Sequence, residues 1–252
     1  MRTLRALLLL LIATASTAQA EWAIEPAEPK DAPSGLQFSE FKATQGSQSV
    51  ELLVVTFNTK GHSLAVMDNP EGAFTLASAA EKRGALAAIN GGYFHANRTP
   101  LGLVVRKGKT LHGAERAKLL SGIVSVRGNK VMIQRAAEFK PSLSVREALQ
   151  AGPFLVDQGK SVSGLNATRA AARSVVFTTN SGHAGLLVCR YTTLAETSQI
   201  LSALTLPTAG RIARALNLDG GSSTGLWVKG ESPFYLREGK EVRNYLGIVA
   251  SQ

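Results

Sequence analysis

Short apolar runs bounded by glycine, proline, asparagine or charged residues recur along most of the chain. A run of this kind predicts a strand that is buried or half-buried in a sheet. The first three predicted strands are residues 36–43, 50–58 and 62–68. The later ones cover residues 85–89, 101–105, 122–126, 131–134, 174–179, 185–191, 211–216, 225–228, 234–237 and 245–250. The pattern therefore predicts a protein made mainly of strands and hairpins.

Three stretches carry helix signals instead. Residues 75–83 predict a short helix stopped by Gly84, because glycine readily takes the left-handed backbone of a helix end. Two capping boxes, each a serine or threonine followed three residues later by glutamate, predict the other helices. They are Ser144 with Glu147, for a helix over residues 145–150, and Thr193 with Glu196, for a helix that reaches about residue 204.

Residues 215–227 hold the densest group of chemically informative side chains. An apolar run ends at Asp219, and Gly220, Gly221 and a patch of small hydroxyl residues follow. This order predicts a buried strand, a tight turn and a second strand. Glycine lets a ligand approach the main chain, so Asp219 and the amides beyond it suit an anionic, oxygen-rich group. An ordinary hairpin turn explains the same composition, because Asp-Gly is a common turn pair.

A second apolar strand ends in a similar way. Residues 85–89 run into Asn90, Gly91 and Gly92, with aromatic residues and His95 immediately after. If this strand and the one before Asp219 are both central and point the same way, their ends converge on one site. His95 then positions a substrate hydroxyl or a phosphate oxygen, although a loop histidine without chemistry is the commoner case.

Arg173 and Cys189 are two further candidates. Arg173 precedes the predicted strand 174–179, where it is either a solvated strand end or a fork that holds carboxylate or phosphate. Cys189 is the single cysteine, so no internal disulfide forms. It lies in an apolar run and shows no activating neighbours, which favours a buried structural thiol.

The first twenty residues have the organisation of a secretory signal peptide. Arg2 and Arg5 precede an apolar stretch over residues 6–13, and small residues at 18–20 suit cleavage. We expect residues 1–20 to be removed, residues 21–35 to form an extended, poorly ordered leader, and residues 36–252 to form one domain. No later run is long enough for a transmembrane helix. The prediction is a secreted or periplasmic protein.

The formal net charge of +10 bears on the choice of partner. Cleavage removes two of the 28 basic residues and none of the 18 acidic ones, so the mature chain stays basic. An excess of positive charge favours an anionic glycan, small or polymeric, although it serves solubility equally well. The basic residues are scattered and aromatic residues are few, which argues against nucleic acid.

No cofactor is predicted from the sequence. Its four histidines, His62, His95, His112 and His183, are dispersed without the spacing of metal ligands. The sequence leaves a carboxylate-held Ca²⁺ open.

Five phrases that occur in order resemble the phosphodiester glycosidase family, which acts on sugar phosphodiesters. They are residues 88–94, 100–103, 151–153, 173–174 and 217–224. The resemblance covers residues 85–252 and implies an α+β fold. This fold is a single domain with a twisted mixed or antiparallel sheet, flanking helices and hairpins, whose motif loops meet in one cleft.

The resemblance also implies a set of site residues. Asn90, Arg173 and Asp219 would form the catalytic polar core, sharing one solvent-reachable hollow. The surrounding substrate-binding residues would be Gly91, Gly92, Tyr93, His95, Asn217, Gly220, Gly221, Ser223, Thr224 and Asn244. Ser222 stands where the family usually has a third glycine, and Gly225 where it often has threonine, so loop geometry and substrate class can differ.

The chemistry implied by this set needs one carboxylate. An ordinary glycosidase uses two, one of them to protonate the leaving group. A phosphate monoester leaves as a stable anion, so a cation such as Arg173 can replace that acid. Asp219 is then the nucleophile or the general base, and Asn90 orients a sugar hydroxyl or the phosphate. We therefore expect an exported glycosidase of carbohydrate metabolism that hydrolyses sugar-1-phosphodiesters to free sugar and a phosphomonoester.

Two other functions remain open. Residues 221–225 fit Gly-x-Ser-x-Gly with Ser223 as the nucleophile of a serine hydrolase, but the last histidine, His183, precedes that serine, against the order of α/β-hydrolases. Alternatively, the site binds an anionic envelope glycan without cleaving it, because a fold does not fix a function.

Overall fold

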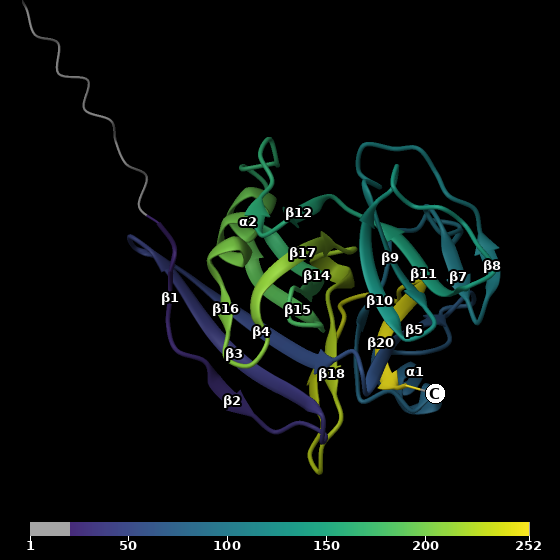
Figure 1. The fold of residues 1–252 in the computed structure, drawn as a ribbon, viewed down its shortest axis with the longest axis horizontal. Helices are drawn as coiled ribbons and strands as arrows, with labels where there is room; N and C mark the ends of the chain where they lie inside the picture. Colours follow the sequence, from purple (N-terminus) through teal and green to yellow (C-terminus); the bar gives the residue numbers. More distant parts are fainter. Residues whose placement is uncertain (1–20, 252) are drawn as a thin grey trace, which may run out of the picture.

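The structure is a computed structural model that describes residues 21–251. Its strands form three sheets, accompanied by two α-helices, which gives the predicted α+β class (Figure 1). The proposed signal peptide, residues 1–20, lies outside the described residues.

The largest sheet has ten strands. Its main path runs β1-β3-β4-β15-β14-β17-β12-β13, while β2 pairs with β3 and β16 with β17. In chain order these strands are β1 (Ala23–Ile24), β2 (Glu28–Lys30), β3 (Leu36–Gln45), β4 (Gln48–Asn58), β12 (Phe154–Asp157), β13 (Lys160–Ser161), β14 (Ala171–Thr179), β15 (His183–Thr192), β16 (Thr205–Leu206) and β17 (Gly210–Asn217). The neighbours of β14 on either side, β15 and β17, are both antiparallel to it.

Two five-stranded sheets complete the domain. One has the order β10-β9-β11-β7-β8 and the other β19-β18-β6-β20-β5. The first contains β7 (Val104–Arg106), β8 (Lys109–His112), β9 (Gly122–Arg127), β10 (Lys130–Arg135) and β11 (Val145–Ala151). The second contains β5 (His62–Asp68), β6 (Ala87–Asn90), β18 (Leu226–Val228), β19 (Phe234–Leu236) and β20 (Asn244–Ala250).

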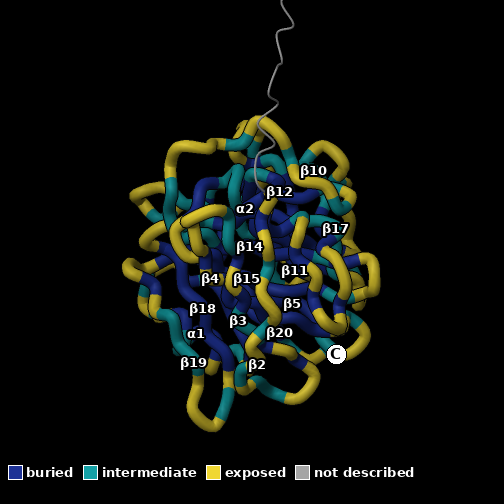
Figure 2. Tube along the Cα trace, turned by 90° about the vertical axis from the view of Figure 1, so that its left-hand side faces the viewer, coloured by how far each residue is buried: buried dark blue, intermediate teal, exposed yellow. Residues whose placement is uncertain are grey.

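The apolar core lies on both faces of the large sheet. Val176 packs in a cluster with Ile89 and Val124 from the two smaller sheets. Its neighbour Val175 points the opposite way, since side chains alternate along a strand, and packs in a second cluster with Ile200 of the helix α2 (Leu194–Ala203). The strands at the centre of the molecule are accordingly buried and the connecting loops exposed (Figure 2).

The capping signals predict two helices correctly. The helix α1 (Leu76–Arg83) ends at Gly84, whose φ of 68° is the left-handed conformation that glycine adopts at little cost. In α2, Thr193 and Glu196 form the reciprocal hydrogen bonds of a capping box.

The prediction of a third helix is wrong, because residues 145–150 belong to the strand β11. β11 pairs with β9 and β7, and five consecutive residues at its end are buried. Glu147 caps no helix. Its carboxylate accepts hydrogen bonds from the main-chain amides of Val66 and Lys107, at 3.1 and 3.3 Å.

The segment expected to be a poorly ordered leader is extended and is part of the large sheet. β1 and β2 both pair with β3. The indole of Trp22 is buried and its Nε1 donates to Oε1 of Gln199 on α2. Residues 21–35 therefore contribute to the folded domain.

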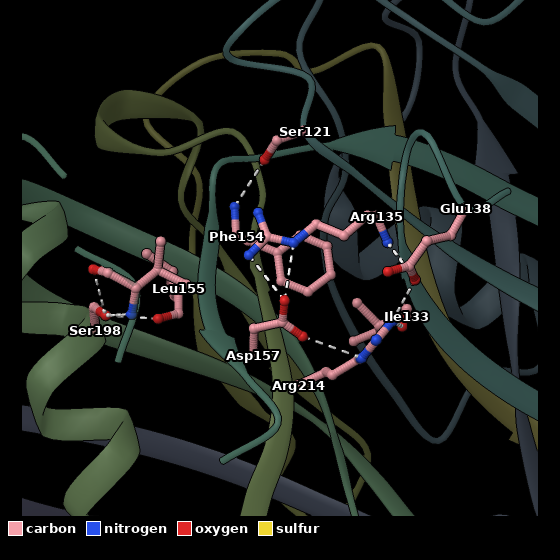
Figure 3. A network of polar contacts seen from close by, with 10 residues as sticks. Ser121, Ile133, Arg135, Glu138, Phe154, Leu155, Asp157, Ser198 and Arg214 are labelled. Atoms are coloured by element: carbon pink, nitrogen blue, oxygen red, sulfur yellow. Dashed lines mark hydrogen bonds and ion pairs between the residues drawn. The ribbon is translucent and has the colours of Figure 1, made fainter. Parts of the chain in front are cut away.

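A network of charged side chains joins the large sheet to a smaller one (Figure 3). Arg135 of β10 contacts Asp157 of β12 at 2.8 Å, and Arg214 of β17 contacts the same carboxylate at 3.4 Å and Glu138 at 3.0 Å. The guanidinium of Arg135 also lies over the ring of Phe154, 4.5 Å from its centroid. These contacts hold both ends of β12, which directly follows the loop that reaches the candidate site.

Candidate active site

Asp219 follows the end of β17, where the register of the large sheet brings it to the same end as Arg173. Val175 of β14 lies opposite Asn217 of β17, and the amide of Leu218 continues the pairing by donating to the carbonyl of Ser174 at 2.8 Å. Counting two residues outward along each strand reaches Arg173 and Asp219. The two charged residues, 46 positions apart in the chain, therefore emerge at one end of adjacent strands.

The main chain of Asp219 is held on both sides by the loop after β6. Its amide donates to the carbonyl of Gly91 at 3.0 Å. Its carbonyl accepts from Nδ2 of Asn90 at 2.7 Å. The two glycine-rich phrases therefore converge, as predicted, although β6 and β17 belong to different sheets.

The carboxylate of Asp219 is half-buried and accepts two local hydrogen bonds. Oδ1 accepts from the amide of Gly220 at 2.9 Å, and Oδ2 accepts from the hydroxyl of Ser223. Burial raises the pKa of Asp219, while the Ser223 hydroxyl, the charge of Lys240 and the Gly220 amide act in the opposite direction. A carboxylate with a raised pKa is a better base, and the hydrogen bonds fix its orientation.

Two glycines allow the close approach of main chains around Asp219. A Cβ on Gly91 would lie 1.9 Å from Oδ1 of Asn244, and one on Gly220 would lie 2.8 Å from the carbonyl of Ala172. Both distances are shorter than real contacts, so side chains at these positions would displace the loops. Gly91 and Gly220 are therefore required by packing, whatever the site binds.

Asn90 lies behind the loop, where it has no exposed surface. Its Oδ1 accepts from the hydroxyl of Ser174 at 2.5 Å and from the amide of Gly225 at 3.2 Å. Because its Nδ2 is bound to Asp219, both ends of the amide are already paired. The sequence places Asn90 in a solvent-reachable hollow, whereas in the structure Asn90 has no solvent contact and its hydrogen bonds hold the Asp219 loop.

Arg173 is half-buried and anchored by main-chain carbonyls. Its Nε donates to the carbonyl of Thr192 at 2.9 Å and its Nη2 to that of Arg169 at 2.5 Å. Within residues 21–251, Nη1 makes no hydrogen bond and no carboxylate pairs with the guanidinium. Burial lowers the pKa of Arg173, but an arginine keeps its charge. A fixed guanidinium with one free nitrogen can bind an anion.

The charges of Asp219 and Arg173 both act on the pKa of Tyr93. Its hydroxyl donates to the carbonyl of Gly152 at 2.7 Å and accepts from Nδ2 of Asn217 at 2.8 Å. Burial and the charge of Asp219 raise the pKa of Tyr93, whereas Asn217 and the charge of Arg173 lower it. The phenol is therefore neutral, and it lies within the field of both charged groups.

The remaining predicted site residues divide into buried supports and exposed positions. Asn244 is buried and its Oδ1 accepts from the amide of Gly92 at 2.9 Å. Ser223 is fully buried, and the buried Thr224 lies 3.4 Å from the hydroxyl of Ser174. His95 and Gly221 are exposed. The predicted set therefore includes several residues that shape the loop rather than face solvent.

Three contributors to the site are missing from the predicted set. Lys240 follows β19, interacts electrostatically with Asp219 and lies 5.2 Å from the ring centroid of Phe94. Ser174 and the carbonyl of Gly152 hold Asn90 and Tyr93. Ser174 and Gly152 belong to phrases that carry the family resemblance, but no sequence pattern marks Lys240.

The described residues were also compared with what a metal site and a membrane-spanning helix require. No group of three or more histidine, cysteine, aspartate or glutamate side chains there is placed to hold a metal ion. No helix in residues 21–251 has the length and apolar character needed to cross a membrane.

A sequence profile of the phosphodiester glycosidase family matches residues 83–249, a range that includes Asn90, Arg173 and Asp219. The chain belongs to the phosphodiester glycosidase family. No protein with curated annotation matches the chain significantly.

Solved structures similar to this family member share its fold. The catalytic domain of zebrafish N-acetylglucosamine-1-phosphodiester alpha-N-acetylglucosaminidase, auto-inhibited by its pro-peptide, superposes with a TM-score of 0.66 at 16% identity, over 90% of this chain and 88% of that one. A hypothetical protein from Synechocystis gives 0.61 at 19% identity over 90% of this chain, which spans only 64% of that protein's length. A Burkholderia pseudomallei protein described as exported gives 0.54 at 13% identity, over 82% and 75% of the two chains.

Proposed function

We propose that this protein is a hydrolase that cleaves the glycosyl bond of a sugar phosphodiester, releasing free sugar and a phosphomonoester. One observation carries the proposal. Asp219 and Arg173 emerge at the same end of adjacent strands, the charge of each acts on Tyr93, and neither forms an ion pair within residues 21–251. A carboxylate and a guanidinium that both act on Tyr93, each without an ionic partner, suit a reaction with an anionic leaving group.

The reaction proceeds by breaking the bond between the anomeric carbon and the phosphate oxygen. The phosphomonoester leaves with the electron pair of that bond, and the oxygen of a water molecule takes its place on the sugar. One proton of that water stays on the new sugar hydroxyl, and the other is released to solvent. Arg173, through Nη1, and Lys240 neutralise the charge that develops on the leaving phosphate. Because this group is already a stable anion, the site needs no second carboxyl group to protonate it.

Asp219 supplies the carboxylate, either as the nucleophile that attacks the anomeric carbon or as the base that activates water. Its raised pKa and its two hydrogen bonds suit both roles. Tyr93 supplies a neutral polar group for sugar hydroxyls or phosphate, and the buried Asn217 holds its hydroxyl in place. Asn90 acts as a positioning residue through the main chain of Asp219, and no cofactor takes part in this scheme.

The expected substrate is an anionic glycan, either a small molecule or a polymer, outside the cytoplasm. The positive net charge supports such a partner. The signal-peptide pattern of residues 1–20 supports export, and one structurally similar protein, from Burkholderia pseudomallei, is described as exported. The zebrafish relative's name gives the chemical class, an N-acetylglucosamine-1-phosphodiester, with which to begin a substrate search.

The test incubates purified protein with a panel of sugar-1-phosphodiesters and measures free sugar. The proposal expects release by the wild type and almost none by Asp219→Asn. Asp31→Asn is a matched control, because Asp31 is an exposed aspartate outside the site. Equal release by wild type and Asp219→Asn removes Asp219 from the mechanism. Unchanged binding with no release by either protein supports a glycan-binding role.

A further inference from the structure

A second arginine lies directly beside Arg173. The carbonyl of Arg169 accepts the hydrogen bond from Arg173 Nη2, and the positive charge of Arg169 opposes the protonation of Arg173. The side chain of Arg169 is exposed and forms no ion pair with any described acidic residue. Two like charges held together without a counterion favour the binding of an anion between them.

Lys240 adds a third cation near Asp219. It interacts with the carboxylate electrostatically, lies against Phe94 and has no ion pair within residues 21–251. Arg169, Arg173 and Lys240 carry three positive charges and Asp219 one negative charge, so these four residues together have an excess of two positive charges. A single phosphodiester carries one negative charge, and a diphosphate diester carries two.

Tyr191 belongs to the strand that pairs with the Arg173 strand. It is in a bulge of β15, between Cys189, which pairs with Arg173, and Thr192, whose carbonyl holds Arg173 Nε. Its side chain is 76% exposed and its φ is 52°, a left-handed conformation that is unfavourable for a bulky residue. An aromatic ring held in solvent by an unfavourable backbone is available to stack on a planar or apolar ligand group.

We propose that the preferred substrate is a glycosyl diphosphate diester, with Arg173 and Lys240 on the phosphate bonded to the sugar and Arg169 on the second phosphate. Tyr191 contacts the group beyond the second phosphate. This inference rests on the proposed function, since it names the substrate class of the same site. Two classes of compound contain such a diphosphate diester: the nucleoside diphosphate sugars and the isoprenyl diphosphate sugars. The exposed ring favours the nucleoside class, whose base can stack.

The experiment compares a monophosphodiester with a diphosphate diester of the same sugar. We expect the wild type to have the higher kcat/KM for the diphosphate diester. Arg169→Gln should lower kcat/KM about 10-fold for the diphosphate diester, the effect expected when one hydrogen bond to a charged group is lost. For the monophosphodiester, the same substitution should lower kcat/KM by less than about 2-fold. The substitution leaves the Arg169 carbonyl, and hence its bond to Arg173, in place. Arg116→Gln is the control, since Arg116 is an exposed arginine in the loop between β8 and β9.

Binding to Asp219→Asn separates this inference from the proposed hydrolysis. If the wild type hydrolyses neither compound but Asp219→Asn binds the diphosphate diester more tightly than the monophosphodiester, the proposed function fails and the diphosphate site stands. If the two compounds bind equally, or Arg169→Gln weakens both equally, the diphosphate inference is overturned.

Tyr191→Asn distinguishes the two sources of the diphosphate, because asparagine accepts a left-handed backbone. We expect this variant to lose activity on the nucleoside diphosphate sugar and little on a short isoprenyl diphosphate sugar. If Tyr191→Asn instead loses activity on the isoprenyl diphosphate sugar and little on the nucleoside diphosphate sugar, the diphosphate assignment stands and Tyr191 contacts an isoprenyl group. No loss on either compound overturns the role of Tyr191.

Discussion

The side-chain amide of Asn90 donates to the main-chain carbonyl of Asp219 across 2.7 Å, although 129 positions separate the two residues. Asn90 ends β6 in one sheet and Asp219 follows β17 in another. The position of the candidate catalytic acid therefore depends on how two sheets pack, and a fully buried amide fixes it.

Replacing Asn90 by alanine should lower kcat more than it raises KM. The substitution leaves the Asp219 carbonyl, the Ser174 hydroxyl and the Gly225 amide without this partner, and the Asp219 loop shifts. A displacement of about 1 Å typically costs about 100-fold in rate. Steady-state kinetics on a sugar phosphodiester measures the effect, with Asn129→Ala, in an exposed hairpin turn, as control. A change in KM alone would assign Asn90 to substrate binding.

Ser223→Ala should move the acid limb of the pH–rate profile to higher pH. The Ser223 hydroxyl lowers the pKa of Asp219 against the effect of burial, so its removal raises that pKa further. Activity above the new limb should stay within about 10-fold of wild type, because only one hydrogen bond is lost. The measurement is kcat/KM against pH. A loss of activity by orders of magnitude at every pH would instead identify Ser223 as a nucleophile.

Gly91→Ala should destabilise the fold through a clash with Asn244. The added Cβ would lie 1.9 Å from Oδ1 of Asn244 and 2.8 Å from its carbonyl oxygen. Overpacking of this kind costs about 1–3 kcal/mol of unfolding free energy. Denaturant unfolding measures it, and Gly61→Ala, with open space around the added atom, should change little. Equal stability of the two variants would contradict the tight packing of the Gly91 loop.

Glu147→Gln should destabilise the protein more at acidic pH than at neutral pH. Burial raises the pKa of Glu147, so the folded protein binds this proton more tightly than the unfolded chain. The stabilisation is complete below the unfolded pKa and is lost as pH rises through the folded value. Glutamine keeps only one acceptor for the amides of Val66 and Lys107, which costs about 1–3 kcal/mol. Unfolding at pH 4 and pH 8 measures the difference, with the exposed Glu81→Gln as control. A penalty that grows with pH contradicts the raised pKa.

The strands and two helices were predictable because their signals are local. Thr193 with Glu196 caps α2 through contacts within one turn, and the apolar runs of β4 and β14 are buried as their patterns predict. The same capping signal failed at Ser144 and Glu147. There the neighbouring strands β7 and β9 pair with the segment, and these contacts outweigh the local preference.

The candidate site was predictable only in part. The phrases around Asn90 and Asp219 identify two loops that meet, because Gly91 and Gly220 are required by the close approach of neighbouring chain segments. The packing of the three sheets decides which polar side chains face solvent. No local sequence pattern therefore predicts that Asn90 is buried. Lys240 reaches the site from a charged loop that resembles any other surface segment.

The most direct test of the account compares wild type with Asp219→Asn for hydrolysis of a sugar-1-phosphodiester, with binding measured in parallel. The account predicts that kcat falls by about 1,000-fold or more while affinity stays within about 10-fold, because the amide keeps the shape of the carboxylate without its basicity. Turnover of the same substrate at the same rate by both proteins would contradict it.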